Sequence, residues 1–210
     1  ALISGDGLIE TLFDQLTFIP TEYPAGEKIF EKRFNATYSL ILSNVLIHYV
    51  LRALDPRTME RIYSLFCFIP EELHVWNLII SPITCIFLHA DAEHLWFNMA
   101  ALWVFGLAVE KRVGWKKFIY FYLMTGFLSS LATPLVYLVS RQEFMSSIGA
   151  SGAIMGIMGV YAVRLFYRKL VFPVPLLPPI FLGFKVKVNS LLLIATYLYL
   201  QIVSVPNMFK

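Results

Sequence analysis

Three polar residues lie in stretches where almost every neighbour is apolar, and their types are those of a nucleophilic site. His94 and Asn98 are four residues apart, so on a helix they share one face. Ser151 lies in the string GASG at 149–152, whose small residues leave room for a peptide backbone to approach the hydroxyl. A serine hydroxyl is a candidate nucleophile, and imidazole and carboxamide donors can bind a developing oxyanion. These residues therefore predict a serine-centred site, provided that the fold brings them together.

Each of these residues also has a purely structural interpretation. A serine in a membrane helix usually donates to the carbonyl of an earlier turn, and a lone histidine such as His94 can simply bond a backbone carbonyl. The glycines spaced through 149–159 also suit the close packing of two helices. Glu110, which is followed by two basic residues, is interpreted as an anchor at the membrane interface.

The composition requires a non-aqueous environment around the elements that position these residues. Of the 210 residues, 58% are hydrophobic and only 15% are charged, whereas roughly a quarter are charged in soluble domains. Five apolar runs are long enough to cross a bilayer as helices, and they lack the alternation of a membrane barrel. The sequence therefore predicts an all-α membrane protein. The runs lie at 37–54, 94–110, 117–139, 147–167 and 186–205.

The lysines and arginines predict how these helices are oriented. A cytoplasmic N-terminus puts most of the 17 basic residues in or beside the cytoplasmic segments. The second and fourth runs then both begin at the outer surface. His94, Asn98 and Ser151 consequently lie at a similar depth, within about the first two helical turns below that surface. This shared depth favours a joint role over three unrelated structural ones.

The remaining segments define the domain organisation. Residues 1–36 form an N-terminal segment, expected in the cytoplasm, with a possible amphipathic helix, and 37–210 form the membrane core. Within that core, the connection at 55–90 is too apolar for water and too interrupted by prolines to span. We expect it to be partly embedded in the membrane. The proline-rich stretch at 172–181 is expected to be a linker between the last two helices.

Several other classes of protein fit the sequence less well. The net charge of +3 is too small to indicate nucleic acid binding, and the basic residues are spread along the chain and do not form one patch. A zinc protease would carry an H-E-x-x-H motif, which the sequence lacks, so neither a metal nor another cofactor is expected. The aspartates lie outside the apolar runs, which argues against an aspartyl intramembrane protease. Cys67 and Cys85 lie in apolar surroundings and are expected to be free, buried thiols.

The residues around the candidate site resemble the rhomboid family of intramembrane serine proteases. GASG at 149–152 matches the motif that carries the family's serine. A second, independent motif is the H-x4-H-x3-N pattern followed by FGxxxE, and it matches at His89, His94, Asn98, Phe105, Gly106 and Glu110. The resemblance covers the chain from about residue 37 to its end, with both motifs in the family's order and spacing.

The resemblance implies a Ser–His dyad without a cofactor. Ser151 would be the nucleophile, and the side chains of His94 and Asn98, with the Ser151 backbone amide, would form the oxyanion hole. Further residues are implied to support this site, with Met155 standing where several members place a tyrosine against the base. These supporting residues are His89, Gly149, Gly152 and Met155.

One part of the family's site has no counterpart in the sequence. In the family the general base is a histidine on a sixth helix after the serine, whereas the last histidine here is His94. The resemblance therefore implies a rhomboid-like helical bundle with five transmembrane helices visible and a sixth expected beyond Lys210. An alcohol of ordinary pKa is a poor nucleophile without such a base.

Two functions follow as expectations, with a third less favoured. The first is an intramembrane serine protease in the bacterial inner membrane, whose partners are the lipid bilayer and single-pass transmembrane substrates, and whose site opens to the extracytoplasmic side. The second is an inactive relative that binds or escorts membrane clients, as the missing base would favour. A small transporter or channel is less favoured because Glu110 is the only carboxylate within a run. The residues do not indicate an oligomeric state.

Overall fold

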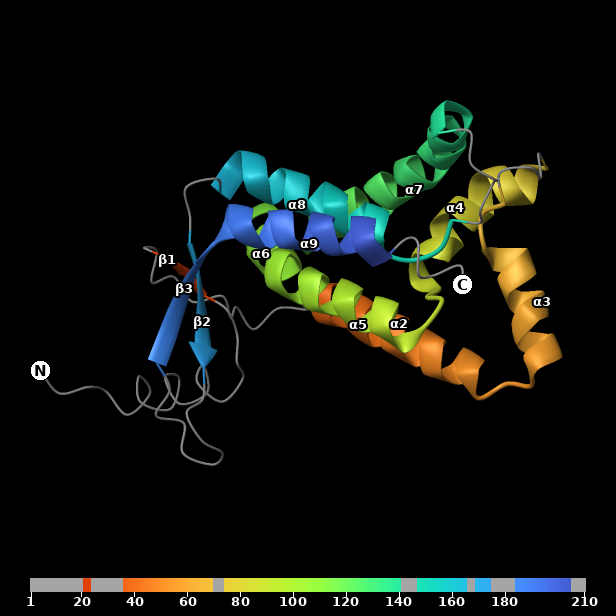
Figure 1. Cartoon of the computed structure of the whole chain (residues 1–210), viewed down its shortest axis with the longest axis horizontal. Coiled ribbons are helices and arrows are strands. Elements are labelled where there is room, and N and C mark those ends of the chain that lie inside the picture. The colour runs from red at the N-terminus through yellow and green to blue at the C-terminus, as the bar shows by residue number, and fades with distance from the viewer. Residues whose placement is uncertain are drawn as a thin grey trace, which may run out of the picture. The chain divides into compact units, whose positions relative to one another are not determined.

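The computed structural model describes residues 21–23, 36–69, 74–140, 147–165, 169–174 and 184–204, and the structural statements below concern these residues. The chain divides into two compact units, one formed by Lys32–Val163 and the other by Ala1–Glu31 with Arg164–Lys210. Figure 1 shows the helices and strands of both units. The expected amphipathic helix near the N-terminus lies outside the described residues.

The unit Lys32–Val163 is helical. Its longest helices are α2, α7, α8 and the continuous helix formed by α5 and α6. The connection between α2 and α5 is built from shorter helices. The helix that runs through α5 and α6, from Ala92 to Val113, has 22 residues and a mean hydropathy of 1.2, and within the described residues it is the one helix long and apolar enough to cross a membrane. The elements are α2 (Ala36–Arg52), α3 (Pro56–Phe66), η1 (Trp76–Ile80), α4 (Ser81–Thr84), η2 (Cys85–Phe87), α5 (Ala92–Ala101), η3 (Leu102–Gly106), α6 (Leu107–Val113), α7 (Trp115–Ser140) and α8 (Ser151–Leu165).

The first four apolar runs all lie on helices, which confirms the helical character of this unit. The run at 37–54 corresponds to α2, the run at 94–110 to α5 through α6, and the run at 117–139 to α7. The fourth helix begins later than predicted, at Ser151 rather than at residue 147. The reason lies in Gly149, whose φ of 107° is incompatible with a right-handed helix.

The second unit contains a small sheet, so the prediction of an all-α protein was wrong here. Its strands β1 (Thr21–Tyr23), β2 (Lys169–Val174) and β3 (Phe184–Asn189) are antiparallel in the order β1-β2-β3, and α9 (Ser190–Ser204) follows β3 directly. The sequence FKVKVN of β3 alternates polar and apolar residues and is rich in valine, a pattern that favours a strand over a helix. The fifth apolar run therefore starts in a strand, and the expected linker overlaps β2.

The connection between α2 and α5 is helical for most of its described length. Asp55 begins α3 as its N-cap, accepting a hydrogen bond from the backbone amide of Thr58 at 3.0 Å, and Pro56 follows at the first helical turn. The hydrogen bonds from Thr58 hold the pKa of Asp55 below its ordinary value. The expected embedding of the connection in the membrane remains a prediction.

Glu110 fixes the start of α2, and the prediction that it is an interfacial anchor was wrong. Its carboxylate is buried and accepts hydrogen bonds from the Ala36 amide at 2.7 Å, the Thr37 amide at 2.8 Å and the Thr37 hydroxyl at 2.7 Å. The first amides of a helix lack partners within the helix, so this side chain supplies them from another helix. One turn earlier, a Cβ on Gly106 would lie 2.9 Å from Cγ2 of Thr37, so the two helices meet where there is no side chain.

Small residues also bring α7 and α8 together. A Cβ on Gly152 would collide with Ser129, and one on Gly156 would collide with Thr125, both on α7. The expected close-packing face is thus confirmed for these two glycines. A Cβ on Gly159 would meet nothing within 4 Å, so Gly159 is not part of this contact. Cys67 and Cys85 are free and buried, as predicted.

Replacement of Glu110 by alanine should destabilise the protein strongly. The change leaves three buried donors of α2 without their acceptor, which we expect to cost about 3 kcal/mol. Glu60→Ala, which removes an exposed carboxylate from α3, serves as the control and should cost little. The free energy of unfolding can be measured by titration with a denaturing detergent. Equal losses in the two variants would contradict the structural role of Glu110.

Candidate active site

Ser151 is the first residue of α8 and is partly exposed. The residues before it are attached to the connection between α2 and α5. Ser147 donates its backbone amide to the carbonyl of Phe68 at 2.8 Å, and Gly149 donates its amide to the carbonyl of Cys85 at 2.9 Å. These two contacts fix where the chain enters α8, and so where the Ser151 hydroxyl is presented.

His94 and Asn98 lie on one face of α5, as their spacing predicts. Asp91 is the N-cap of this helix and accepts from the His94 backbone amide at 2.7 Å, so the helix begins just before the histidine. His94 is 9% exposed and Asn98 is fully buried. Both side chains are therefore held inside the fold, in contact with other segments.

Gly149 joins the serine loop to these two side chains. A Cβ on this residue would lie 2.6 Å from Cε1 of His94, 2.9 Å from its Nε2 and 3.6 Å from Nδ2 of Asn98. The backbone two residues before Ser151 therefore packs directly against the imidazole and lies beside the carboxamide. Its φ of 107° is a second reason for glycine, since side chains are strained there. The structure thus brings Gly149, two residues before Ser151, together with His94 and Asn98.

His89 lies on the loop before α5, fully buried, with its ring centroid 5.2 Å from that of His94. Its carbonyl accepts a hydrogen bond from the Tyr63 hydroxyl at 2.7 Å, which ties the loop to α3. Burial, followed by the charges of neighbouring His94 and His48, lowers the pKa of His89 to about 3. A histidine with this pKa is neutral at physiological pH and a weak base, so its place suits packing rather than proton transfer.

The other two predicted supporting residues lie in the first two turns of α8. Gly152 packs against Ser129 of α7, whereas Met155, one turn after Ser151, is 38% exposed. No histidine occurs between Ser151 and Lys210, and α9 in particular has the sequence SLLLIATYLYLQIVS. Within the described residues, no three histidine, cysteine or acidic side chains gather as metal ligands.

Two positioning residues were missed from the sequence. Asp91 sets the start of α5, and its signal was present, because an aspartate directly before a helical run is a common N-cap. Cys85 acts through its backbone carbonyl, which holds Gly149, and no sequence pattern marks a carbonyl for such a contact. The missed residues both act on the placement of the site, not on its chemistry.

The arrangement has the components for stabilising negative charge beside a hydroxyl. The start of α8 directs backbone amides toward its N-terminal end, where a helix favours an anion. The His94 imidazole and Asn98 carboxamide lie against the residues that lead into this end. An oxyanion formed at a carbonyl attacked by Ser151 would have donors of both kinds within the same small region.

The family model and the relatives that match this chain belong to one family. Residues 73–205 match the family model described as Rhomboid domain. The chain is 34% identical over 93 residues to Putative rhomboid protease YdcA of Bacillus subtilis, covering 44% of this chain and 43% of that protein. It is 34% identical over 100 residues to Rhomboid protein 1, mitochondrial, of Saccharomyces cerevisiae, covering 46% of this chain and 29% of that protein. It is 38% identical over 96 residues to Rhomboid protease GluP of Bacillus subtilis, covering 45% of this chain and 17% of that protein. The chain thus spans less than half the length of these relatives.

Substitution of Gly149 by alanine should displace His94. Gly114→Ala is a matched control, because Gly114 also has a positive φ, of 80°, but a Cβ there would meet nothing within 4 Å. Both changes strain the backbone, by about 1–2 kcal/mol, and only Gly149→Ala adds a collision with the imidazole. We expect the larger loss of thermal stability in Gly149→Ala, together with a shift of the His94 signals in NMR spectra of histidine-labelled protein. Unshifted His94 signals in that variant would contradict the contact.

Proposed function

The chain belongs to the rhomboid family, and from this premise we propose that it is an intramembrane serine protease with Ser151 as its nucleophile. The observation that carries the proposal is the contact of Gly149 with His94 and Asn98, two residues before Ser151. A lone serine at a helix start would be unremarkable. A serine whose loop packs on an imidazole and a carboxamide has the surroundings that acyl transfer needs.

In the proposed mechanism, Oγ of Ser151 attacks the carbonyl carbon of a substrate peptide bond. The carbonyl oxygen becomes an oxyanion, which accepts hydrogen bonds from the side chains of His94 and Asn98 and from the Ser151 backbone amide. The C–N bond then breaks, leaving an acyl group on Ser151 and releasing an amine that has taken up the serine's proton. Attack by water releases the second product and restores the hydroxyl.

The proton transfers in this mechanism require a general base. His89 is a poor candidate because the pKa of its imidazole is about 3, and His94 has the role of an oxyanion donor. We therefore propose that the base is a histidine on a sixth helix beyond Lys210. Its side chain would lie near Met155, which is partly exposed on the turn of α8 that follows Ser151.

The proposal includes a place in the membrane and a class of substrate. Rhomboid membership indicates a membrane protein, and we propose the bacterial inner membrane, with the N-terminus in the cytoplasm and the site opening outward. Two of the three relatives named above come from Bacillus subtilis and one is named mitochondrial. The proposed substrates are single-pass membrane proteins, cut near the outer end of their helix.

A second candidate is an inactive relative that binds or escorts membrane clients. The observation that favours it is that no histidine follows Ser151 within the 210 residues. The packing of Gly149 on His94 and Asn98 favours the protease, because a protein that only binds clients does not need donors beside a serine.

Ser151→Ala should abolish proteolysis without unfolding the protein. The nucleophile is removed, while a methyl group in place of the hydroxymethyl group preserves the start of α8. Cleavage of a single-pass substrate by the full-length protein in liposomes measures the effect, and Ser64→Ala, at an exposed position of α3, is the control. Cleavage that persists in Ser151→Ala would rule out this serine as the nucleophile.

His94→Ala and Asn98→Ala should each lower the cleavage rate by about 10- to 1,000-fold, the range for loss of one oxyanion donor. The effect should fall on kcat, because the hydrogen bonds strengthen only as the oxyanion forms. His74→Ala, which removes an exposed histidine elsewhere in the unit, should leave kcat unchanged. Normal kcat values in both site variants would mean that the oxyanion is stabilised by other groups.

A further inference from the structure

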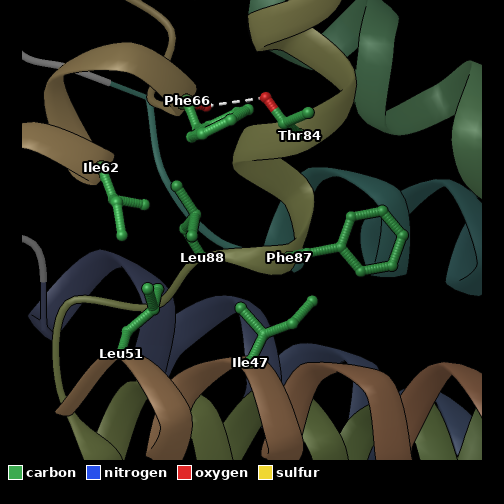
Figure 2. A pocket seen from close by; sticks show the side chains of 7 residues that line it. All are labelled: Ile47, Leu51, Ile62, Phe66, Thr84, Phe87 and Leu88. Carbon is green, nitrogen blue, oxygen red and sulfur yellow. Dashed lines mark hydrogen bonds between the residues drawn. The ribbon is translucent and has the colours of Figure 1, made fainter. Parts of the chain in front are cut away.

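An apolar pocket lies between α2, α3 and the segment that leads to His89, and its volume is about 230 Å³. Figure 2 shows side chains from these three segments pointing into one common space. The Thr84 hydroxyl at its edge donates to the Phe66 carbonyl at 2.9 Å, so the polar group of the lining is engaged within the protein. The apolar lining comes from Ile47, Leu51, Ile62, Phe66, Phe87 and Leu88.

The pocket lies under a helix whose apolar face is only partly covered by protein. None of the 11 residues of α3 is buried. Its residues Met59, Ile62, Tyr63 and Phe66 are half-buried, whereas Leu65 and the charged residues are exposed. A helix with separate apolar and polar faces needs an apolar partner along the whole of its apolar face. Here part of that partner is the buried cluster around Leu51 and Leu88, and the remainder is the pocket.

Two arginines are next to lining residues in the sequence. Arg52 directly follows Leu51, donates to the Ala90 carbonyl, and acts with its positive charge on the Tyr63 phenol of α3. Arg61 directly precedes Ile62 and is exposed. The acidic residues of the same stretch are Asp55, which caps α3 through Thr58, and the exposed Glu60. A guanidinium group has five N–H donors, so Arg52 can donate to a phosphate group while it also donates to the Ala90 carbonyl.

The same connection exposes apolar side chains to the surroundings. Val75, Ile79 and Ile83 are spaced by four residues on consecutive helical turns and are 74%, 52% and 37% exposed. The Trp76 ring is also exposed, and its indole N–H donates to the Leu65 carbonyl at 2.8 Å. Such a row fits the predicted embedding of this connection in the membrane, which would place lipid acyl chains against these side chains.

We propose that the pocket binds part of one acyl chain of a membrane phospholipid, whose phosphate group is held by Arg52 and Arg61. An α-helix, about 10 Å across, is too wide for this volume, and a polar ligand would find no polar partners in the lining. A single acyl chain is thin and apolar, and completes the cover of α3. The bound lipid ties α3 to the segment that ends at Leu88, next to His89. This inference does not depend on the proposed protease activity.

The test uses full-length protein in liposomes that contain phosphatidylglycerol with a photoreactive diazirine in its acyl chain. After illumination, mass spectrometry of the digested protein locates the crosslinks. We expect crosslinks on the peptides that carry Ile62, Phe66 and Phe87. Ile47→Phe, which fills the pocket, should reduce these crosslinks at least fivefold, whereas Leu46→Phe, at an exposed position of the same helix, should not.

A second pair of variants tests the phosphate site. The double variant Arg52→Gln/Arg61→Gln should weaken pocket labelling several-fold, while Lys117→Gln, an exposed lysine at the start of α7, should leave it unchanged. Melting temperatures of all variants identify any that fail to fold. A folded Ile47→Phe variant that is labelled like Leu46→Phe would overturn the acyl-chain site. Labelling that is insensitive to the loss of both arginines would overturn the phosphate site, and so would equal labelling by a photoreactive fatty alcohol.

Discussion

The start of α8 contacts its neighbours through residues that have no side chain. Gly149 packs against His94 and Asn98, and Gly152 and Gly156 pack against α7. Any larger residue at these positions would separate α8 from one neighbour or the other. Because Ser151 lies between these contacts, its position relative to α5 is set by how closely three backbones approach. The candidate site is therefore a result of helix packing, and not of a long loop that reaches across the fold.

A related constraint applies to polar groups, which lipid cannot satisfy. The carboxylate of Glu110 accepts from the first two amides of α2, and the carboxylate of Asp91 accepts from the His94 amide in the first turn of α5. In both cases a carboxylate accepts hydrogen bonds from amides at a helix start, which have no acceptor within the helix. The Glu110 contact ties α6 to the start of α2, and α5, which carries His94 and Asn98 and continues into α6, lies beside α2.

The sequence predicted the helices of the main unit and the residues of the site better than it predicted the connections between them. Apolar runs identify α2, α5 through α6, α7 and α8 because lipid-facing and buried residues are both apolar. The start of α8 was misplaced because the backbone angle of Gly149 cannot be read from composition. The sheet was missed because Phe172–Val174 lies in a proline-rich stretch, and strand pairing depends on partners distant in the sequence. Glu110 was misjudged because its partners, Ala36 and Thr37, are more than 70 residues away.

The central claim is that Ser151 is an activated nucleophile, and the most direct measurement is its covalent labelling. Full-length protein, kept folded in mild detergent, is treated with a fluorophosphonate probe, and the labelled peptide is identified by mass spectrometry. The account predicts a label on Ser151 that disappears when this serine is replaced by alanine. Protein that is folded but carries no label on Ser151 would contradict the account and favour a relative that binds membrane clients without cutting them.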